Sequence, residues 1–396
     1  PRESTRDTVI WELRVRSGRG RSDVESAKSF AELGLDSLEV IDLIFACEER
    51  FGVTLDARAS LSSTAPLDEL VSLIEHAGLT LTRDQLLDLT KGREARVFDL
   101  DSPQLASPQL DGVQAVLHCA GPFSHTSKPM VSACLAAGAH YLDITGEIDV
   151  FELAQSLDSR ARAAGVLLCP GVGFDVVPTD SVALALAEAL PRATHLALGF
   201  DSKMSPSRGT ARTMVEGLAQ GGRVRRDGRI VRVPLGYRDR RIDFGGGEKL
   251  AMTIPWGDVS TAFHTTGIPN VETYVPISPG RLRQLRRLNW IRGLLGFGFV
   301  QNLLKGRIAR QPPGPDERER DRTPTRVWGE VRDAQGEVRT ARIVVANGYT
   351  VTVHAALGIV ERLLAGPVPA GAVTPARLMG RGFVETLPGS GRIVVG

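Results

Sequence analysis

The 396-residue chain has few cysteines, few aromatic residues and no long apolar run. Its four cysteines, Cys47, Cys119, Cys134 and Cys169, lie in apolar segments at wide, irregular spacing. This spacing argues against a disulfide framework or a zinc site and predicts reduced, buried thiols. No apolar segment approaches the ~20 residues of a membrane span, and no signal peptide opens the sequence. We therefore expect a cytoplasmic, globular protein with room for two or three domains.

Charge is distributed unevenly along the chain. Residues 1–80 hold 9 Lys/Arg and 15 Asp/Glu, a net charge of −6, so residues 81–396 carry +8 of the total of +2. Residues 281–326 alone hold 12 Lys/Arg and 4 Asp/Glu. An acidic front module and a basic back segment can attract each other or recruit partners of opposite sign.

The most informative segment is FAELGLDSL, residues 30–38, which places Ser37 at the start of a predicted helix. Asp36 can cap that helix, and Glu39 can complete a capping box. A hydroxyl just inside a helix N-terminus lies among free N–H groups and the positive end of the helix dipole, where a phosphate is favoured. An ordinary capped helix start is the alternative.

This segment resembles the attachment site of acyl and peptidyl carrier proteins, whose serine carries phosphopantetheine. The resemblance implies 4'-phosphopantetheine on Ser37 and a small all-α four-helix carrier bundle over residues 1–80. It also implies a phosphopantetheinyl transferase as partner, and polyketide or fatty-acid synthesis enzymes that dock on the acidic helix after Ser37. That helix supplies Glu39, Asp42, Glu48 and Glu49, which can equally form a solvated face.

From residue 95 the pattern changes to alternating strands and helices, which favours an α/β domain with a parallel sheet. The predicted elements are a strand at 95–101, a helix at 102–110, a strand at 115–121, a helix at 130–137, a strand with its loop at 140–147, a helix ending at 160–164, and a strand, glycine-rich loop and helix start at 165–180.

Four strings in this part, VLHCAGPFSHTSKPMVSACLAAGAHYLDITGE, CPGVGFDVVPTD, SRGTARTMVEG and TIPWGDVSTA, resemble saccharopine dehydrogenase-like reductases. Within that group they are most similar to the trans-acting enoyl reductases of polyketide and lipid synthesis. The resemblance implies a Rossmann-like NADPH domain, here partial, over 81–180. It implies an α+β substrate domain over 181–345, which often forms a homodimer interface. It further implies a C-terminal helix near 349–364, within a segment 346–396 that returns to the Rossmann sheet.

One expected feature is missing. A Rossmann domain opens with a strand, a glycine-rich turn and a helix that hold the pyrophosphate. Only 16 residues separate Gly78 from Ala95, whereas a complete βαβ unit needs about 30. The pairs Gly18/Gly20 and Gly245–Gly247 follow no buried strand. The chain therefore resembles a carrier joined to a reductase that lacks its first two strands, which puts NADPH binding and its distinction from NADH in doubt.

The candidate site residues follow predicted strands, because loops at the carboxyl ends of parallel strands gather around the ligand. As cofactor-binding residues we predict Ser37 for phosphopantetheine and, for the dinucleotide, Cys119, Ala120, Gly121, Pro122, Phe123, Gly146, Glu147, Gly171, Gly173, Phe174 and Asp175. Gly121-Pro122 can also be a plain tight turn, and Asp175 and Asp180 can cap the following helix. For Asp180 capping is favoured.

Hydride transfer needs alignment and often a nearby proton donor, for which we predict Tyr141, His125 or Asp143. No cluster of His, Cys, Asp and Glu has metal-ligand spacing.

Residues 281–310 form a basic amphipathic stretch. Such a stretch can lie on a membrane surface, which would make the protein peripheral to the membrane, or dock an acidic carrier. It can also cover an acyl pocket or pack into its own domain. Nucleic acid is not favoured, because the arginines do not alternate with stacking aromatics.

The favoured hypothesis is a carrier-protein/reductase fusion that reduces an enoyl or related acyl group, held as a phosphopantetheine thioester on Ser37, with NADPH. Tethering the substrate raises its effective concentration. The alternative is a non-catalytic carrier and docking protein whose reductase domain cannot bind cofactor. A truncated or misjoined gene product is a third possibility.

Overall fold

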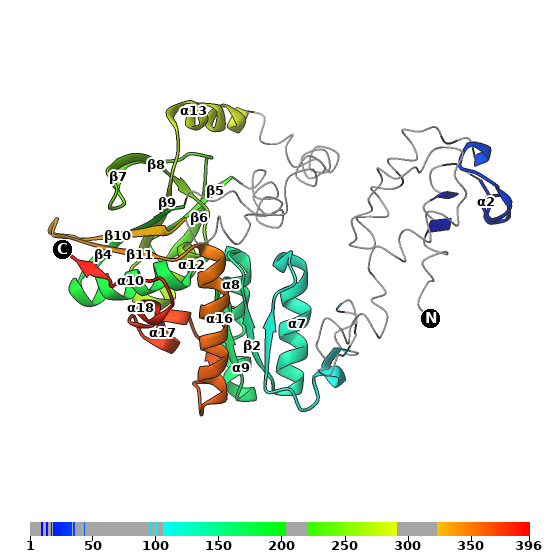
Figure 1. Ribbon diagram of the computed structural model, residues 1–396, viewed down its shortest axis with the longest axis horizontal. Coiled ribbons are helices and arrows are strands. Elements are labelled where there is room, and N and C mark those ends of the chain that lie inside the picture. The colour runs from blue at the N-terminus through cyan, green and yellow to red at the C-terminus, as the bar shows by residue number, and fades with distance from the viewer. Residues whose placement is uncertain are drawn as a thin grey trace. The chain divides into compact units, whose positions relative to one another are not determined.

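The computed structural model describes residues 106–202, 221–290 and 323–396, together with residues 9, 10, 13, 14, 17, 19–33, 35, 43, 96, 98 and 100. The chain divides into two compact units, Pro1–Val97 and Phe98–Gly396 (Figure 1).

The secondary-structure elements described in the first unit are helices and turns. Residues 9, 10, 13, 14 and 17 are helical, and they are followed by α2 (Arg21–Ser26) and the 3-10 turn η1 (Ala31–Leu33). Its buried apolar side chains are Val9, Ile10, Leu13, Val24, Phe30, Leu33, Leu35 and Leu43. Ser37 and the acidic helix after it lie outside the described residues, so the four-helix bundle stays a prediction.

The second unit begins with a parallel sheet. Its strands β1 (Ala115–His118), β2 (His140–Asp143), β3 (Leu167–Cys169) and β12 (Gly371–Ala372) pair in that order. Successive side chains point to opposite faces. Tyr141 and Leu168 therefore pack into a cluster under α7 (Phe123–Ala137), α8 (Ile148–Ser156) and α9 (Asp158–Ala164), while Leu142 and Leu167 pack into the cluster of α16 (Gly348–Leu364). Helices on both faces explain why these strands are apolar throughout.

The second sheet is mixed and packs against two helices. In the described part it comprises nine strands, in the order β13-β11-β10-β4-β9-β5-β6 with β7 and β8 attached to β9. The bounds are β4 (Ala193–Asp201), β5 (Gly222–Arg226), β6 (Arg229–Val233), β7 (Asp239–Asp243), β8 (Glu248–Ile254), β9 (Asn270–Pro276), β10 (Thr325–Asp333), β11 (Val338–Val345) and β13 (Val394–Val395). The remaining elements are η3 (Ser107–Leu110), α10 (Val177–Ala189), α12 (Asp258–Thr266), α13 (Pro279–Leu288), α17 (Pro375–Met379) and α18 (Phe383–Thr386). Gly329 of β10 lets α10 pack closely, because a Cβ there would lie 2.7 Å from Val182 and Leu186 side-chain atoms.

Glu152 of α8 joins the two sheets. Its carboxylate accepts hydrogen bonds of 2.6 Å from Arg225 of β5 and from the Ser260 hydroxyl of α12, and His264 Nε2 lies 3.5 Å away. Burial opposes the charged form of Glu152, but these donors and the Arg225 charge lower its pKa to about 2. A charged, well-partnered Glu152 therefore fixes the parallel sheet's helices against the second sheet.

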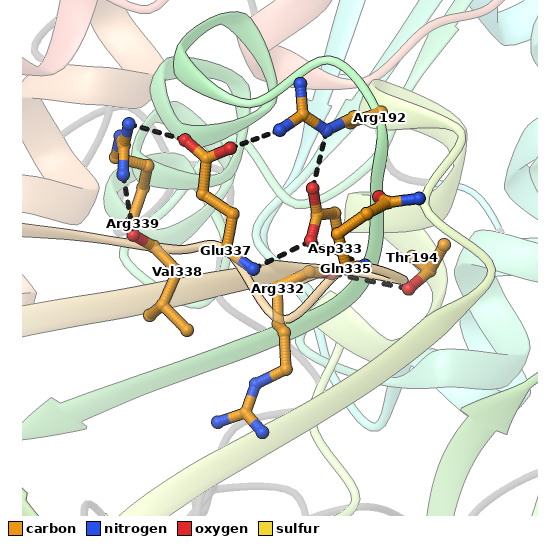
Figure 2. Close-up of polar contacts among 8 residues, drawn as sticks. All are labelled: Arg192, Thr194, Arg332, Asp333, Gln335, Glu337, Val338 and Arg339. Carbon is orange, nitrogen blue, oxygen red and sulfur yellow. Dashed lines mark hydrogen bonds and ion pairs between the residues drawn. The ribbon is translucent and has the colours of Figure 1, made fainter.

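A second ionic cluster holds the β10–β11 hairpin (Figure 2). Asp333 Oδ1 accepts the backbone N–H groups of Gln335 and Glu337, and Asp333 Oδ2 accepts from Arg192 Nε at 2.5 Å. Arg192 also pairs with the Glu337 carboxylate, which Arg339 contacts from the other side at 2.5 Å. One arginine thus ties the start of β4 to the hairpin turn.

The predicted strands at β1, β2 and β3 and the C-terminal helix α16 are confirmed. The strand expected at 95–101 is not formed at Arg96, Phe98 or Leu100, the positions described within it. In the described part no strand lies beyond β1 to pair with this segment, and Phe98 and Leu100 pack under α7 instead. Cys119 is exposed rather than buried, whereas Cys134 and Cys169 are buried free thiols. None of the described helices is long and apolar enough to cross a bilayer.

Candidate functional site

The loop after β1 forms one wall of the carboxyl edge of the parallel sheet. Cys119, Ala120, Gly121 and Pro122 are exposed, and the Gly121–Pro122 peptide bond is cis. Behind the loop, the Thr126 hydroxyl donates to Ala120 O at 2.7 Å and lies 2.9 Å from His118 Nε2. The buried histidine is thus a partnered core residue, and burial lowers its pKa.

The β2 loop is connected to the start of α7 through Glu147. The Glu147 carboxylate accepts the Phe123 backbone N–H at 3.1 Å, and its own N–H donates to the Thr145 hydroxyl at 3.1 Å. A carboxylate at a helix N-terminus satisfies a free N–H group and complements the helix dipole. Glu147 therefore caps α7 and brings the predicted loops after β1 and β2 together.

Asp143 organises the loops after β2 and β3. It is fully buried, and its carboxylate accepts the Tyr141 hydroxyl at 2.7 Å, Thr145 N at 3.0 Å and Gly171 N at 2.8 Å. Burial raises the pKa of Asp143 to about 6, although the three hydrogen bonds oppose the rise. Because its hydrogen-bond donors belong to β2 and to the loops after β2 and β3, this carboxylate holds the two loops together.

Glycines let three segments approach one another at this edge. Gly171 has φ +73°, and a Cβ there would lie 2.6 Å from the Phe151 ring. A Cβ on Gly146 would lie 2.9 Å from Asp175 Oδ2, and one on Gly173 would lie 3.0 Å from Thr352 of α16. Gly171 is required by its backbone conformation and by contact, so the glycine-rich loop predicted after β3 has a structural reason.

Three carboxyl groups surround the first turn of α10, and their surroundings differ. Asp180 accepts hydrogen bonds from the Thr265 hydroxyl at 2.6 Å and from the Ala376 backbone N–H at 3.0 Å. It therefore binds the N-terminal turn of α17 and does not cap α10, whose N-cap is Val176. Asp258, at the start of α12, is fully buried, and neither of its oxygens has a hydrogen-bond partner in the described structure. Asp175 is partly exposed.

A row of three aromatic side chains joins the segments that precede α10 and α12. The Phe174 ring centroid lies 5.4 Å from that of Phe200 on β4, and Phe200 lies 5.0 Å from Trp256, which precedes α12. All three side chains are only partly buried. Phe174 is positioned by its backbone N–H, which donates to the Thr352 hydroxyl of α16 at 3.0 Å. Together they present a partly exposed apolar surface, suited to a chain of methylene groups.

The three predicted proton donors differ in burial and in hydrogen bonding. Tyr141 is fully buried, and its hydroxyl already donates to Asp143, which together with burial raises its pKa. Asp143 is enclosed as described above. His125 is exposed on the first turns of α7. Sequence reasoning did not single out Asp258, Trp256, Phe200 or Thr352, although the first two stand in the quoted TIPWGDVSTA string.

The described residues do not fit a complete dinucleotide. A pyrophosphate site needs a glycine-rich turn between a strand and a helix. In the described part no strand precedes β1, and the sequence from residue 66 to 114 holds only Gly78, Gly92 and Gly112, all widely spaced. The geometry of the described residues therefore supports no reaction step through the cofactor.

A family model described as a phosphopantetheine attachment site matches residues 16–65. A probable mitochondrial saccharopine dehydrogenase-like oxidoreductase of Arabidopsis thaliana is 34% identical over 112 residues, covering 26% of this chain and 25% of the relative. A trans-acting enoyl reductase of Mycobacterium ulcerans is 34% identical over 109 residues, with 26% and 25% covered. The chain thus spans about a quarter of the length of these relatives.

Among solved structures, apo saccharopine dehydrogenase (L-Glu forming) from Saccharomyces cerevisiae has a similar fold. The TM-score is 0.54 at 11% identity, with 80% of this chain and 92% of that chain covered. The chain therefore joins a phosphopantetheine attachment site at residues 16–65 to a part with saccharopine dehydrogenase-like and trans-acting enoyl reductase homologues.

Proposed function

We propose that the chain carries an acyl group as a phosphopantetheine thioester on Ser37 and that its second unit reduces an enoyl or related acyl group in polyketide or lipid biosynthesis. The match to the attachment site supports the carrier role. The observation that carries the substrate class is the half-buried aromatic row of Phe174, Phe200 and Trp256. This row offers an acyl chain an apolar surface at the edge where α/β folds bind ligands.

The reductant in this proposal is NADPH, which would supply hydride. The residues we assign to its nicotinamide end are the loops at Cys119–Phe123, Gly146–Glu147 and Gly171–Asp175. A phosphopantetheinyl transferase, acyl-handling enzymes and a second copy of the chain are the proposed partners. The proposed location is the cytoplasm, where residues 281–310 provide the proposed contact with a membrane surface.

A second candidate function follows from the missing glycine-rich turn. Without a pyrophosphate site the second unit binds no dinucleotide, and the chain is a carrier and docking protein without redox activity. The same edge, with its aromatic row, would then hold the acyl group without reducing it.

One experiment separates the two functions. The full chain is treated with a phosphopantetheinyl transferase and crotonyl-coenzyme A, loading is read by mass spectrometry, and NADPH consumption is followed by absorbance. Ser37→Ala should abolish loading, whereas Ser26→Ala, a nearby exposed serine of α2, should leave it intact. Loading followed by conversion of crotonyl to butyryl supports the reductase. Loading without NADPH binding in the folded protein selects the carrier function, and loading of the Ser37→Ala variant refutes both.

A further inference from the structure

Helix α13 packs on the second sheet through one face. Its Leu282 is 4% exposed, and a Cβ on Gly236 would lie 2.9 Å from Leu282 Cδ1. Arg286 Nε donates to Gly236 O at 2.9 Å. The Asn289 side chain extends this face, since it makes hydrogen bonds of 2.9 and 3.0 Å with the backbone N–H and carbonyl of Leu235. These contacts turn the opposite face of α13 outward, at the periphery of the unit (Figure 1).

The outward face carries two arginines and a tryptophan. Arg283, Arg287 and Trp290 follow one another at i, i+4 and i+7, the spacing of a single helix face, and a 3-10 turn continues α13 through residue 290. All three side chains are exposed, Trp290 to 93%. No carboxylate among the described residues pairs with Arg283 or Arg287, whereas Arg286 on the inner side pairs with Asp239 at 2.5 Å. We refer to these three residues as the arginine–tryptophan face.

Charge and the exposed indole together select the partner of this face. Residues 273–315 contain eight Lys/Arg and no Asp or Glu, so no acidic residue along this part of the chain offsets the arginines. Tryptophan is favoured at the interface of a bilayer, where its ring lies at the level of the headgroups. The sequence after Trp290, IRGLLGFGFVQNLL, is rich in leucine and phenylalanine. An acidic protein surface would match the arginines alone, whereas an anionic bilayer also matches the tryptophan.

We propose that the arginine–tryptophan face of α13 binds the surface of an anionic bilayer. Arg283 and Arg287 meet the negatively charged headgroups, and Trp290 lies at the headgroup level. This inference rests on the proposed function, in which residues 281–310 contact a membrane surface, and it names the lipid charge and the side chains of that contact. The face contains none of the residues assigned to the acyl group or to the nicotinamide, so binding needs neither a loaded Ser37 nor a reductant.

The test is co-sedimentation of the full chain with vesicles of phosphatidylcholine and phosphatidylglycerol in equal parts. Each basic residue near an anionic surface contributes about fivefold to binding, so Arg283→Ala/Arg287→Ala should bind about 25-fold more weakly than the wild type. Arg160→Ala/Arg392→Ala removes the same charge from exposed arginines elsewhere and should bind like the wild type. Wild-type binding should weaken with salt and on pure phosphatidylcholine. Equal binding by the two double variants overturns the proposal.

Trp290 gives a second measurement that does not depend on charge. Lipids brominated on their acyl chains should quench part of the wild-type tryptophan fluorescence, and Trp290→Phe should remove that part. Quenching that persists in Trp290→Phe would place another segment at the bilayer and refute the proposed face. Self-association that Arg283→Ala/Arg287→Ala abolishes, without any vesicle binding by the wild type, would identify an acidic protein surface as the partner and refute the bilayer. Both measurements are made on the unloaded chain, so a failure of Ser37 loading or of reduction does not affect them.

Discussion

Replacing Asp143 by asparagine tests whether the buried carboxyl that organises the carboxyl edge weakens the fold as it ionises. Asparagine has nearly the same shape, and its carbonyl oxygen can still accept the N–H groups of Thr145 and Gly171. Its amide group would face the Tyr141 hydroxyl, which can accept as well as donate. The substitution therefore removes the titration and leaves the loop connections largely in place.

The size and sign of the effect follow from the pKa of Asp143. Burial raises it from 3.8 to about 6 in the folded state, which corresponds to about 3 kcal/mol. Because the folded pKa lies above the unfolded one, the contribution is fully present below pH 3.8 and is lost as the pH rises to about 6. Relative to the wild type, Asp143→Asn should thus gain about 3 kcal/mol of stability between pH 4 and pH 7.

The assay is urea denaturation of both proteins at several pH values, followed by tryptophan fluorescence. Loss of a hydrogen bond to Tyr141 shifts the variant by a constant amount of about 1 kcal/mol, so only the pH dependence of the difference is interpreted. Asp227→Asn, at an exposed turn where φ is +47°, is the matched control. A difference between Asp143→Asn and the wild type that stays flat from pH 4 to pH 7 would contradict the reasoning.

Three shorter predictions concern the carrier, the glycine-rich loop and the hairpin. Ser37→Ala should give no phosphopantetheine adduct in the intact mass after transferase treatment. Gly171→Ala, which forces a Cβ to 2.6 Å from the Phe151 ring at φ +73°, should cost roughly 3 kcal/mol and lower the melting temperature. Arg192→Met should lower the melting temperature at low salt by removing the ion pair to Asp333, and the effect should shrink at high salt. A salt-independent effect would mean that packing dominates.

Alternation of apolar strands with helices was enough to predict β1, β2 and β3, because each strand is short, apolar and followed by a glycine or proline turn, whereas α16 was expected only from the family resemblance. The strand expected at 95–101 is not formed at its three described positions, and the reason is nonlocal. The ARVFDLD pattern suits a strand, but pairing needs a neighbour, and in the described part none lies beyond β1. Cys119 was predicted to be buried by its apolar neighbours, yet it lies in the exposed loop after β1.

The candidate site residues also differ in how far the sequence alone predicts them. Gly171 has a local conformational reason, since its φ is +73°, whereas Gly146 is constrained by its contact with the Asp175 side chain, which the sequence alone does not show. Asp258 could not be predicted, since what distinguishes it is that neither oxygen of a buried carboxyl has a hydrogen-bond partner among the described residues, a property of the packing of α12 on α10. Phe200 and Trp256 could not be predicted either, because they form one aromatic surface only through the contact between β4 and the turn before α12.

The hydrogen-bond donors, more than burial, separate the roles of the carboxyl groups at this edge. Asp143 and Asp180 are as buried as Asp258, but each is held by donors from neighbouring loops or helices, so each fixes the backbone. Asp258 has no partner among the described groups and is therefore expected to keep its proton. Asp175 differs from these three groups because it is partly exposed. Burial alone therefore does not predict which carboxyl groups hold the backbone in place, whereas the donors packed around each of them do.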